Sequence, residues 1–140
     1  MHKDIDIPRI LIVEDNKTIA DCMKIMLSQA GYCVADIVAS GEEAVDIARK
    51  TLPDLILMDI KLWGELDGIT AYEQIKKTID IPVVFVSAYA DEDVIARAMQ
   101  SKPSGYIVKP FKAVQLIGEV EKSLEWHRLR QVKKDKNESI

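Results

Sequence analysis

LILMD, residues Leu55–Asp59, is the stretch that decides the fold, because four apolar residues run without a break into a carboxylate. Such a run is typical of a strand that is buried on both faces, as in a parallel sheet. Similar runs that end in a polar group occur at Ile10–Val13, Val83–Val86 and Tyr106–Val108, and we predict a further strand at Tyr32–Val38. The pattern therefore predicts five strands.

The segments between these strands carry apolar residues at helical spacing, as Ile19, Met23 and Met26 do after the first strand. Ser40-Gly41-Glu42-Glu43 is typical of a helix N-terminus, because the serine and glutamate side chains can accept hydrogen bonds from each other's free amides. Further helices are predicted to begin at Asp67-Gly68, after Asp91, and near Lys112, the last one running past Trp126. Strands and helices that alternate in this way indicate a parallel sheet with helices on both faces.

The composition is that of a soluble globular domain, with 48% hydrophobic and 30% charged residues in a chain of 140. A net charge of −4 and a pI near 5.2 argue against a nucleic-acid-binding surface over the main body. No apolar run reaches the ~20 residues of a membrane-spanning helix, and the N-terminal residues lack the apolar region of a signal peptide. We expect one cytoplasmic domain that contacts neither membrane nor nucleic acid directly.

The two cysteines, Cys22 and Cys33, are too few for a disulfide framework. Both lie in apolar stretches, so we expect buried free thiols in a reducing compartment. Nothing in their spacing indicates a redox function.

Polar side chains at the ends of four predicted strands are expected to meet at one edge of the sheet. Parallel strands all end at the same edge, and ligands bind in the crevice there. The first strand brings Glu14 and Asp15 to this edge, the third Asp59, the fourth Ser87 and the fifth Lys109. Clustered carboxylates are costly unless a cation joins them, and hard oxygen ligands suit Mg²⁺. The residues therefore predict a magnesium site with a lysine beside it.

A carboxylate between a metal ion and a lysine is suited to attack phosphorus, because phosphoryl transfer needs in-line positioning and neutralised equatorial oxygens. Ser87 can hydrogen-bond a phosphoryl group and so sense its presence. Taken alone, Glu14-Asp15 is also compatible with acids at a helix N-terminus, and Tyr106 with an aromatic core residue. Their combination with Asp59 and Lys109 favours the phosphoryl site.

Five sequence blocks together resemble the receiver domain of two-component response regulators, and the resemblance extends from about Pro8 to about Glu125. The blocks are Leu11–Asp15, Leu55–Ile60, Asp67-Gly68, Val84–Ala88 and Tyr106–Phe111. The resemblance implies a flavodoxin-like α/β fold, a doubly wound five-stranded parallel sheet of order 2-1-3-4-5 with helices on both faces. It places the receiver domain at residues 8–126, an N-terminal tail at 1–7, and a basic polar tail or linker at 127–140.

The resemblance also implies a role for each residue of the predicted magnesium site. Asp59 is expected to be the phosphoacceptor, and Asp15 and Asp59 are expected to ligate Mg²⁺ directly. The main-chain carbonyl of Lys61 is expected to be the third protein ligand, and Glu14 to act through a metal-bound water. The donor would be a phosphohistidine on a partner histidine kinase or phosphotransfer protein.

A second group of residues is expected to report phosphorylation. Ser87, helped by the amide of Ala88, is expected to bind the phosphoryl group, and Lys109 to pair with it. Tyr106 is expected to turn inward when Ser87 is drawn to the phosphate. The change would alter the face made by the fourth helix, fifth strand and fifth helix, where an effector or a second copy, giving a homodimer, would bind.

The loop after the acceptor departs from the commonest receiver pattern. Trp63 stands where receivers commonly carry proline, and Asp67-Gly68 lies one residue later than usual. We therefore expect Leu62–Leu66 to be a remodelled loop on the rim of the site, with consequences for partner choice and magnesium geometry. Tyr89, two positions after Ser87, is expected to stand over the site and govern water access.

The sequence favours an active receiver, which we expect to be a switch rather than an enzyme, over several other functions. A phosphatase acting through an aspartyl-phosphate typically needs a second acid two residues after its nucleophile, and that position is Lys61. A nucleotide or flavin binder would carry a glycine-rich loop after a strand, which is missing from the sequence. An inactive receiver that acts only as an interaction module usually lacks the acceptor or the lysine. The chain as a fragment of a larger hybrid kinase or regulator stays open.

Overall fold

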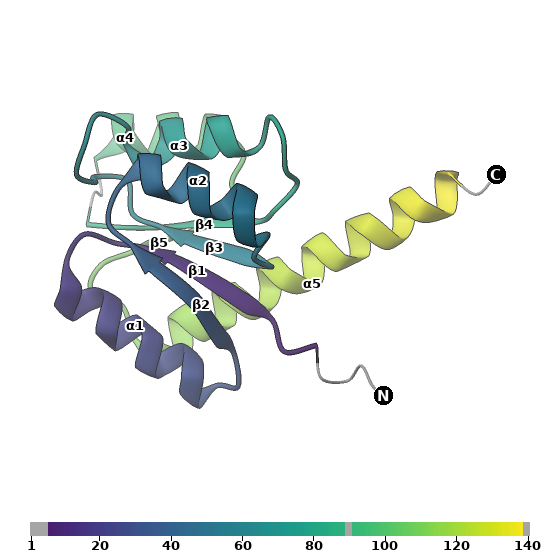
Figure 1. Cartoon of the computed structure of the whole chain (residues 1–140), viewed down its shortest axis with the longest axis horizontal. Helices are drawn as coiled ribbons and strands as arrows, with labels where there is room; N and C mark the ends of the chain where they lie inside the picture. The colour runs from purple at the N-terminus through teal and green to yellow at the C-terminus, as the bar shows by residue number, and fades with distance from the viewer. Residues whose placement is uncertain (1–5, 89–90, 139–140) are drawn as a thin grey trace.

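The computed structural model describes residues 6–88 and 91–138, and Figure 1 labels its helices and strands. Strands and helices alternate along the whole described chain, as the sequence predicted. Their bounds are β1 (Arg9–Val13), α1 (Lys17–Gln29), β2 (Cys33–Val38), α2 (Gly41–Thr51), β3 (Leu55–Met58), α3 (Gly68–Ile75), β4 (Val83–Ser87), α4 (Glu92–Gln100), β5 (Gly105–Val108) and α5 (Ala113–Glu138).

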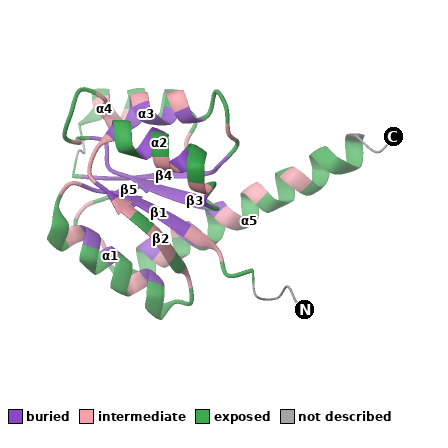
Figure 2. Ribbon diagram, in the orientation of Figure 1, coloured by how far each residue is buried: buried purple, intermediate pink, exposed green. Residues whose placement is uncertain are grey.

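The five strands form one parallel sheet in the order β2-β1-β3-β4-β5, which confirms the predicted α/β fold and strand order. Each strand is shared between two apolar layers. Along β1, for example, Ile10 and Ile12 pack into the layer beneath α1 and α5, whereas Leu11 and Val13 pack into the layer beneath α2, α3 and α4. The continuous apolar runs of the three central strands follow from this arrangement, because neither face of β1, β3 or β4 reaches water (Figure 2).

The register of the strands places their polar end residues side by side. Val13 lies opposite Met58, so the residues that follow β1 and β3 are neighbours. Ser87 lies opposite Val108, so Lys109 leaves the sheet next to the end of β4. Four segments that are distant in sequence therefore end at one edge, on the side of the sheet away from the projecting end of α5 (Figure 1).

Side-chain caps begin the first four helices, and those of α2, α3 and α4 confirm predicted starts. The side chain of Asn16 accepts a hydrogen bond from the Ile19 amide and begins α1. Equivalent caps are Ser40 for α2, Asp67 for α3 and Asp91 for α4. Because the first turn of α1 carries no acid, Glu14 and Asp15 lie ahead of the helix and are not part of its first turn.

Both cysteines are exposed free thiols, so the expectation that they are buried was wrong. Cys22 lies beside Met23 on α1, but the buried residues of this helix are Ala20, Met23 and Leu27. Cys33 begins β2, which is an edge strand, and its side chain faces water. The apolar neighbours of the two cysteines in the sequence did not indicate which side of the helix or strand is covered by other elements.

The last helix is longer than predicted. It continues without a break from Ala113 to Glu138, so the segment from His127 to Glu138, expected to be a basic polar tail or linker, is helical in the structure. Figure 1 shows this part of α5 projecting away from the sheet. Within residues 6–88 and 91–138, no helix has both the length and the apolar character needed to cross a bilayer.

Candidate functional site

Three carboxylates gather at the carboxyl ends of β1 and β3, and we call Glu14, Asp15 and Asp59 the acid pocket. Each contributes one oxygen atom, and these oxygens lie within 4.8 Å of one another. Glu14 is 3% exposed and Asp59 is 7% exposed, whereas Asp15 is half-buried. Like charges at this separation favour a bound cation.

Backbone hydrogen bonds of the sheet hold the acid pocket together. The Asp59 amide donates to the carbonyl of Val13 at 2.9 Å, and the Glu14 amide donates to the carbonyl of Val38 at 2.9 Å. The two acids therefore continue the strand pairing beyond the strands themselves. Their positions depend on sheet register more than on loop conformation.

Lys109 neutralises part of the acid pocket. Its Nζ lies 2.9 Å from Asp59 Oδ2 and 2.7 Å from Glu14 Oε1, and all three side chains are largely buried. Its backbone amide donates to the carbonyl of Ser87 at 2.8 Å, and the peptide bond from Lys109 to Pro110 is cis. Burial opposes the charged ammonium, but the contacts with Glu14 and Asp59 outweigh it and raise the pKa of Lys109.

Glu14 is the acid most affected by its surroundings. Burial raises its pKa from 4.5 to about 7, a shift that the Lys109 ammonium opposes and the charge of Asp59 increases. The second oxygen of Glu14 accepts a hydrogen bond from the Asn16 amide at 3.2 Å. A carboxylate this costly to ionise marks a place where an additional positive charge would be stabilising.

The acid pocket fits a divalent metal ion of the magnesium type. Its donors are oxygens only, they converge, and Asp15 is open to water, which Mg²⁺ retains as part of its coordination. Lys61, expected to supply a carbonyl ligand, is exposed and lies two residues beyond Asp59 at the start of the loop to α3. The residues present therefore suit the cation that the sequence predicted.

Ser87 and Tyr106, the predicted switch residues, lie next to each other at the edge of the acid pocket. Ser87 is fully buried, and a hydrogen bond joins its side chain to that of Tyr106. Burial raises the pKa of the half-buried Tyr106, the bond to Ser87 opposes this shift, and the charge of Asp59 adds to it. The Tyr106 ring also packs against Phe85, with centroids 6.4 Å apart. Ala88 follows Ser87 and is exposed, whereas Tyr89 lies outside the described residues.

The structure explains why Asp67 and Gly68 occur where α3 begins. Any Cβ at Gly68 would overlap the carbonyl oxygen of Asp59, so only glycine lets α3 begin against the backbone of Asp59. Asp67 caps α3 and also pairs with Arg97 of α4, with Nη1 2.6 Å from Oδ2. Sequence reasoning did not single out Arg97, because no local pattern links a residue on one helix to the cap of another.

The Leu62–Leu66 loop lies in the connection between β3 and α3. Trp63 is 69% exposed there, and its backbone forms an isolated parallel bridge with Ser40. Glu42, at the start of α2, accepts a hydrogen bond from the Glu65 amide at 3.1 Å. Sequence reasoning assigned Glu42 only to the helix start, and its contact with this loop was missed.

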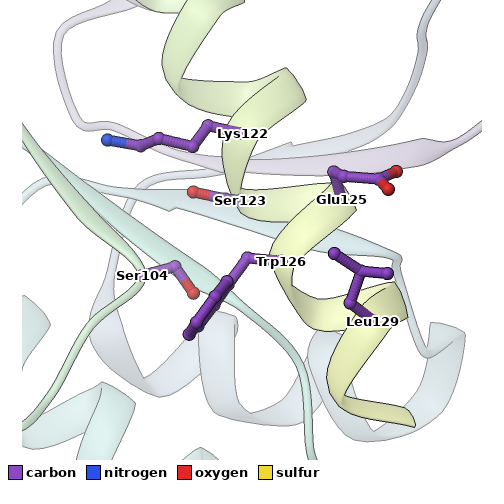
Figure 3. A pocket seen from close by; sticks show the side chains of 6 residues that line it. All are labelled: Ser104, Lys122, Ser123, Glu125, Trp126 and Leu129. Atoms are coloured by element: carbon purple, nitrogen blue, oxygen red, sulfur yellow. The ribbon is translucent and has the colours of Figure 1, made fainter. Parts of the chain in front are cut away.

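A cavity of about 350 Å³ lies at the opposite end of the sheet, beneath α5 (Figure 3). Its lining residues are Ser104, Lys122, Ser123, Glu125, Trp126 and Leu129. None of them belongs to the acid pocket or to the switch residues. The chemistry predicted from the sequence is thus confined to the carboxyl edge of the sheet.

Comparison with known proteins agrees with this geometry. Residues 10–121 match the model of the response regulator receiver domain. The chain is 35% identical over 113 residues to the transcriptional regulatory protein PdtaR of Mycobacterium tuberculosis, which covers 81% of this chain and 55% of that protein. It is 31% identical over 112 residues to the DNA-binding response regulator MtrA of Mycobacterium tuberculosis, covering 80% of this chain and 48% of that protein.

A solved structure is similar over almost its full length. The signal receiver domain of a modulated diguanylate cyclase from Desulfovibrio desulfuricans has a TM-score of 0.84 and 34% identity, covering 89% of this chain and 99% of that chain. The chain spans about half the length of the curated relatives it matches. The similarity therefore concerns the domain that carries the acid pocket.

Proposed function

The chain belongs to the response regulator receiver domain family of two-component systems, and on that premise we propose that it is a phosphorylation-dependent switch whose acceptor is Asp59. The observation that carries the proposal is the Lys109 ammonium, which contacts both Asp59 and Glu14 beside the half-buried Asp15. A carboxylate in such a setting has cationic partners for the charge that a phosphoryl group brings.

In the proposed reaction, a carboxylate oxygen of Asp59 attacks the phosphorus of a phosphohistidine on a partner kinase or phosphotransfer protein. The new bond joins Asp59 to phosphorus while the phosphorus–nitrogen bond breaks, and the donor imidazole keeps the electron pair and takes up a proton. Lys109 neutralises an equatorial phosphoryl oxygen. The domain thereby assists its own phosphorylation and its slow dephosphorylation, and is a switch rather than a turnover enzyme.

Mg²⁺ is the cofactor that the acid pocket supports. Asp15 and Asp59 would hold it directly, the carbonyl of Lys61 would complete the protein ligands, and Glu14 would act through a water molecule. The ion would supply positive charge to the transferring phosphoryl group.

Ser87 is proposed to carry the signal away from Asp59. Its hydroxyl is bonded to Tyr106, and a phosphoryl group on Asp59 would compete for it, with the Ala88 amide as a second donor. The position of Tyr106 would then follow the occupancy of Asp59. This would change the face formed by α4, β5 and α5, where Met99, Val108 and Val114 are exposed; an effector or a second copy would bind there.

A receiver that serves only as an interaction module is the alternative. The acceptor, the lysine and the acidic residues are all in place, and this observation favours the active form. The basic tail beyond residue 126 would then be a solvated face or a connection to a further domain of a larger kinase or regulator.

The test is to add Mg²⁺ with beryllofluoride, or with a small-molecule phosphodonor, to the ¹⁵N-labelled chain and follow the amides of Ser87, Ala88 and Tyr106. We expect these resonances to shift, and the phosphodonor to add the mass of one phosphoryl group. Asp59→Asn should show neither the resonance shifts nor the added mass. Its rate of labelling should be lower than that of the wild type by a factor of at least about 100. Asp46→Asn, at an exposed acid of α2, serves as the matched control and should behave as wild type.

A wild-type chain that shows no shift and no added mass would contradict the proposal. So would an Asp59→Asn variant that responds as the wild type does.

A further inference from the structure

The loop that follows Asp59 is held to the start of α2 by contacts with residues at that end of the helix. Glu42 Oε2 accepts a hydrogen bond from the Glu65 amide at 3.1 Å. Bonds from its own amide, from Glu65 and from Leu66 lower the pKa of Glu42. A carboxylate that accepts a hydrogen bond from an amide of another segment helps to fix the path of that segment.

Two glycines allow the close approach of loop and helix. Gly64 has φ +90°, and a Cβ there would lie 2.6 Å from Glu42 Oε1. A Cβ at Gly41 would lie 2.7 Å from the carbonyl oxygen of Leu66. The chain thus has small residues on both sides of the contact, where larger ones would push the two backbones apart.

A third contact comes from the backbone alone. Ser40 and Trp63 form a parallel bridge, so the loop is tied to the residues before α2 as well as to the helix. The loop begins at Lys61, immediately after Ile60, whose carbonyl accepts a bond from the Gly68 amide at 2.7 Å. Its near end is therefore anchored beside Asp59, and Glu42 anchors its far half.

We propose that Glu42 is a positioning residue of the magnesium site, which holds the Lys61–Leu66 loop against α2 and so keeps the carbonyl of Lys61 directed to the ion. Glu42 has no role as a ligand. The inference rests on the proposed function, because it assumes that Mg²⁺ binds in the acid pocket with the help of Lys61. It also explains how a loop that departs from the common receiver pattern can retain the geometry of a ligand.

The experiment is a titration of the full chain with Mg²⁺ alone. Binding is measured by calorimetry and by the NMR resonances of the Ile60 and Lys61 amides. We expect Glu42→Ala to weaken Mg²⁺ binding about 10-fold, as loss of groups that orient metal ligands commonly does. Glu42→Gln keeps one accepting oxygen and should lie between Glu42→Ala and the wild type. Asp46→Ala, on the exposed side of the same helix, is the matched control and should leave the affinity unchanged.

Gly64→Ala tests the contact from the loop side. The added Cβ would displace the Glu42 carboxylate, so we expect Gly64→Ala to weaken Mg²⁺ binding. Gly64→Ala should weaken Mg²⁺ binding less when it is introduced into Glu42→Ala than when it is introduced into the wild type. The emission of Trp63, recorded in a Trp126→Phe background, should change in Glu42→Ala before any Mg²⁺ is added. This reports release of the loop independently of the metal.

The outcomes separate the two proposals. If the wild type binds Mg²⁺, Asp59→Asn weakens that binding, and Glu42→Ala binds as tightly as the wild type, the positioning role of Glu42 is wrong and the switch stands. If Mg²⁺ does not bind the wild type, or binds Asp59→Asn equally well, the magnesium site fails and the role of Glu42 fails with it. A 10-fold loss in Glu42→Ala with an unchanged melting temperature supports the inference.

Discussion

The acid pocket and the projecting half of α5 both carry charged side chains, but the two regions hold them differently. In the acid pocket, Lys109 contacts two carboxylates that come from other strands, and all three groups are largely buried. On α5, Arg130 and Lys134 form no ion pair with any described residue, and Trp126 is 61% exposed. Charges that water solvates need no partner, whereas buried charges do.

The difference teaches where substitutions should matter. The acid pocket is assembled from β1, β3 and the segment after β5, so removing one group leaves the others in a low-dielectric site. The projecting half of α5 is a single helix, and most of its described residues are exposed (Figure 2). We therefore expect large effects in the acid pocket and small ones on α5, for stability as well as for metal binding.

Lys109→Ala is expected to produce the largest effect on stability. It leaves Glu14 and Asp59 facing each other without a cation, which should lower the free energy of unfolding by about 3 kcal/mol in the presence of a chelator. Added Mg²⁺ should restore part of this loss. Urea unfolding with and without Mg²⁺ measures both quantities, and Lys112→Ala, at an exposed lysine nearby, is the control. Equal stability of Lys109→Ala and wild type would remove the distinction between the two regions.

The pH dependence of the metal-free chain should show the cost of ionising Glu14. Its pKa is about 7 in the folded chain, against an ordinary value of 4.5, so between these pH values the folded state binds more protons than the unfolded state. The free energy of unfolding should therefore fall as pH rises from about 4.5 to about 7 and level off above. After allowance for solvent screening, this contribution is about 2 kcal/mol.

Glu14→Gln isolates that contribution, because glutamine does not titrate. Urea unfolding in chelator at several pH values measures the free energy of unfolding of both chains. As pH rises through this range, the wild type should lose stability relative to Glu14→Gln. A difference that is independent of pH would mean that Glu14 ionises in the fold as freely as in water.

Trp126→Ala should produce the smallest effect. The side chain covers part of the cavity beneath α5 (Figure 3) but is mostly exposed, so we expect a loss below about 1 kcal/mol and no change in Mg²⁺ affinity. Thermal unfolding and calorimetry test the two statements. A severalfold change in Mg²⁺ affinity would show that the two ends of the sheet are coupled, and the comparison between them would need revision.

Much of the fold was predictable from local patterns. Apolar runs indicated the strands, and the caps Ser40, Asp67 and Asp91 indicated three helix starts, because each pattern reflects hydrogen bonds and burial within a few residues. The exposure of Cys22 and Cys33 was not predictable in this way. The spacing of apolar residues indicates that a helix or strand has a buried side. Which residues at the border of that side are covered depends on the neighbouring element that packs there.

The gathering of Glu14, Asp15, Asp59 and Lys109 at one edge was also predictable, because parallel strands all end at the same edge. The exact partners were not. Local patterns did not indicate that Asp67 pairs with Arg97, or that Glu42 contacts the loop after Asp59. These contacts join helices and loops whose relative positions follow from packing.

The sequence by itself therefore determined the order of the elements and the set of polar residues that ends the strands. Tertiary structure alone decided the register that sets Val13 against Met58, the close approach of Gly68 to Asp59, and the hold of Glu42 on its loop. The physical reason is range: backbone hydrogen bonding and burial period are properties of neighbouring residues, whereas contacts between distant segments exist only once the sheet and its helices have packed.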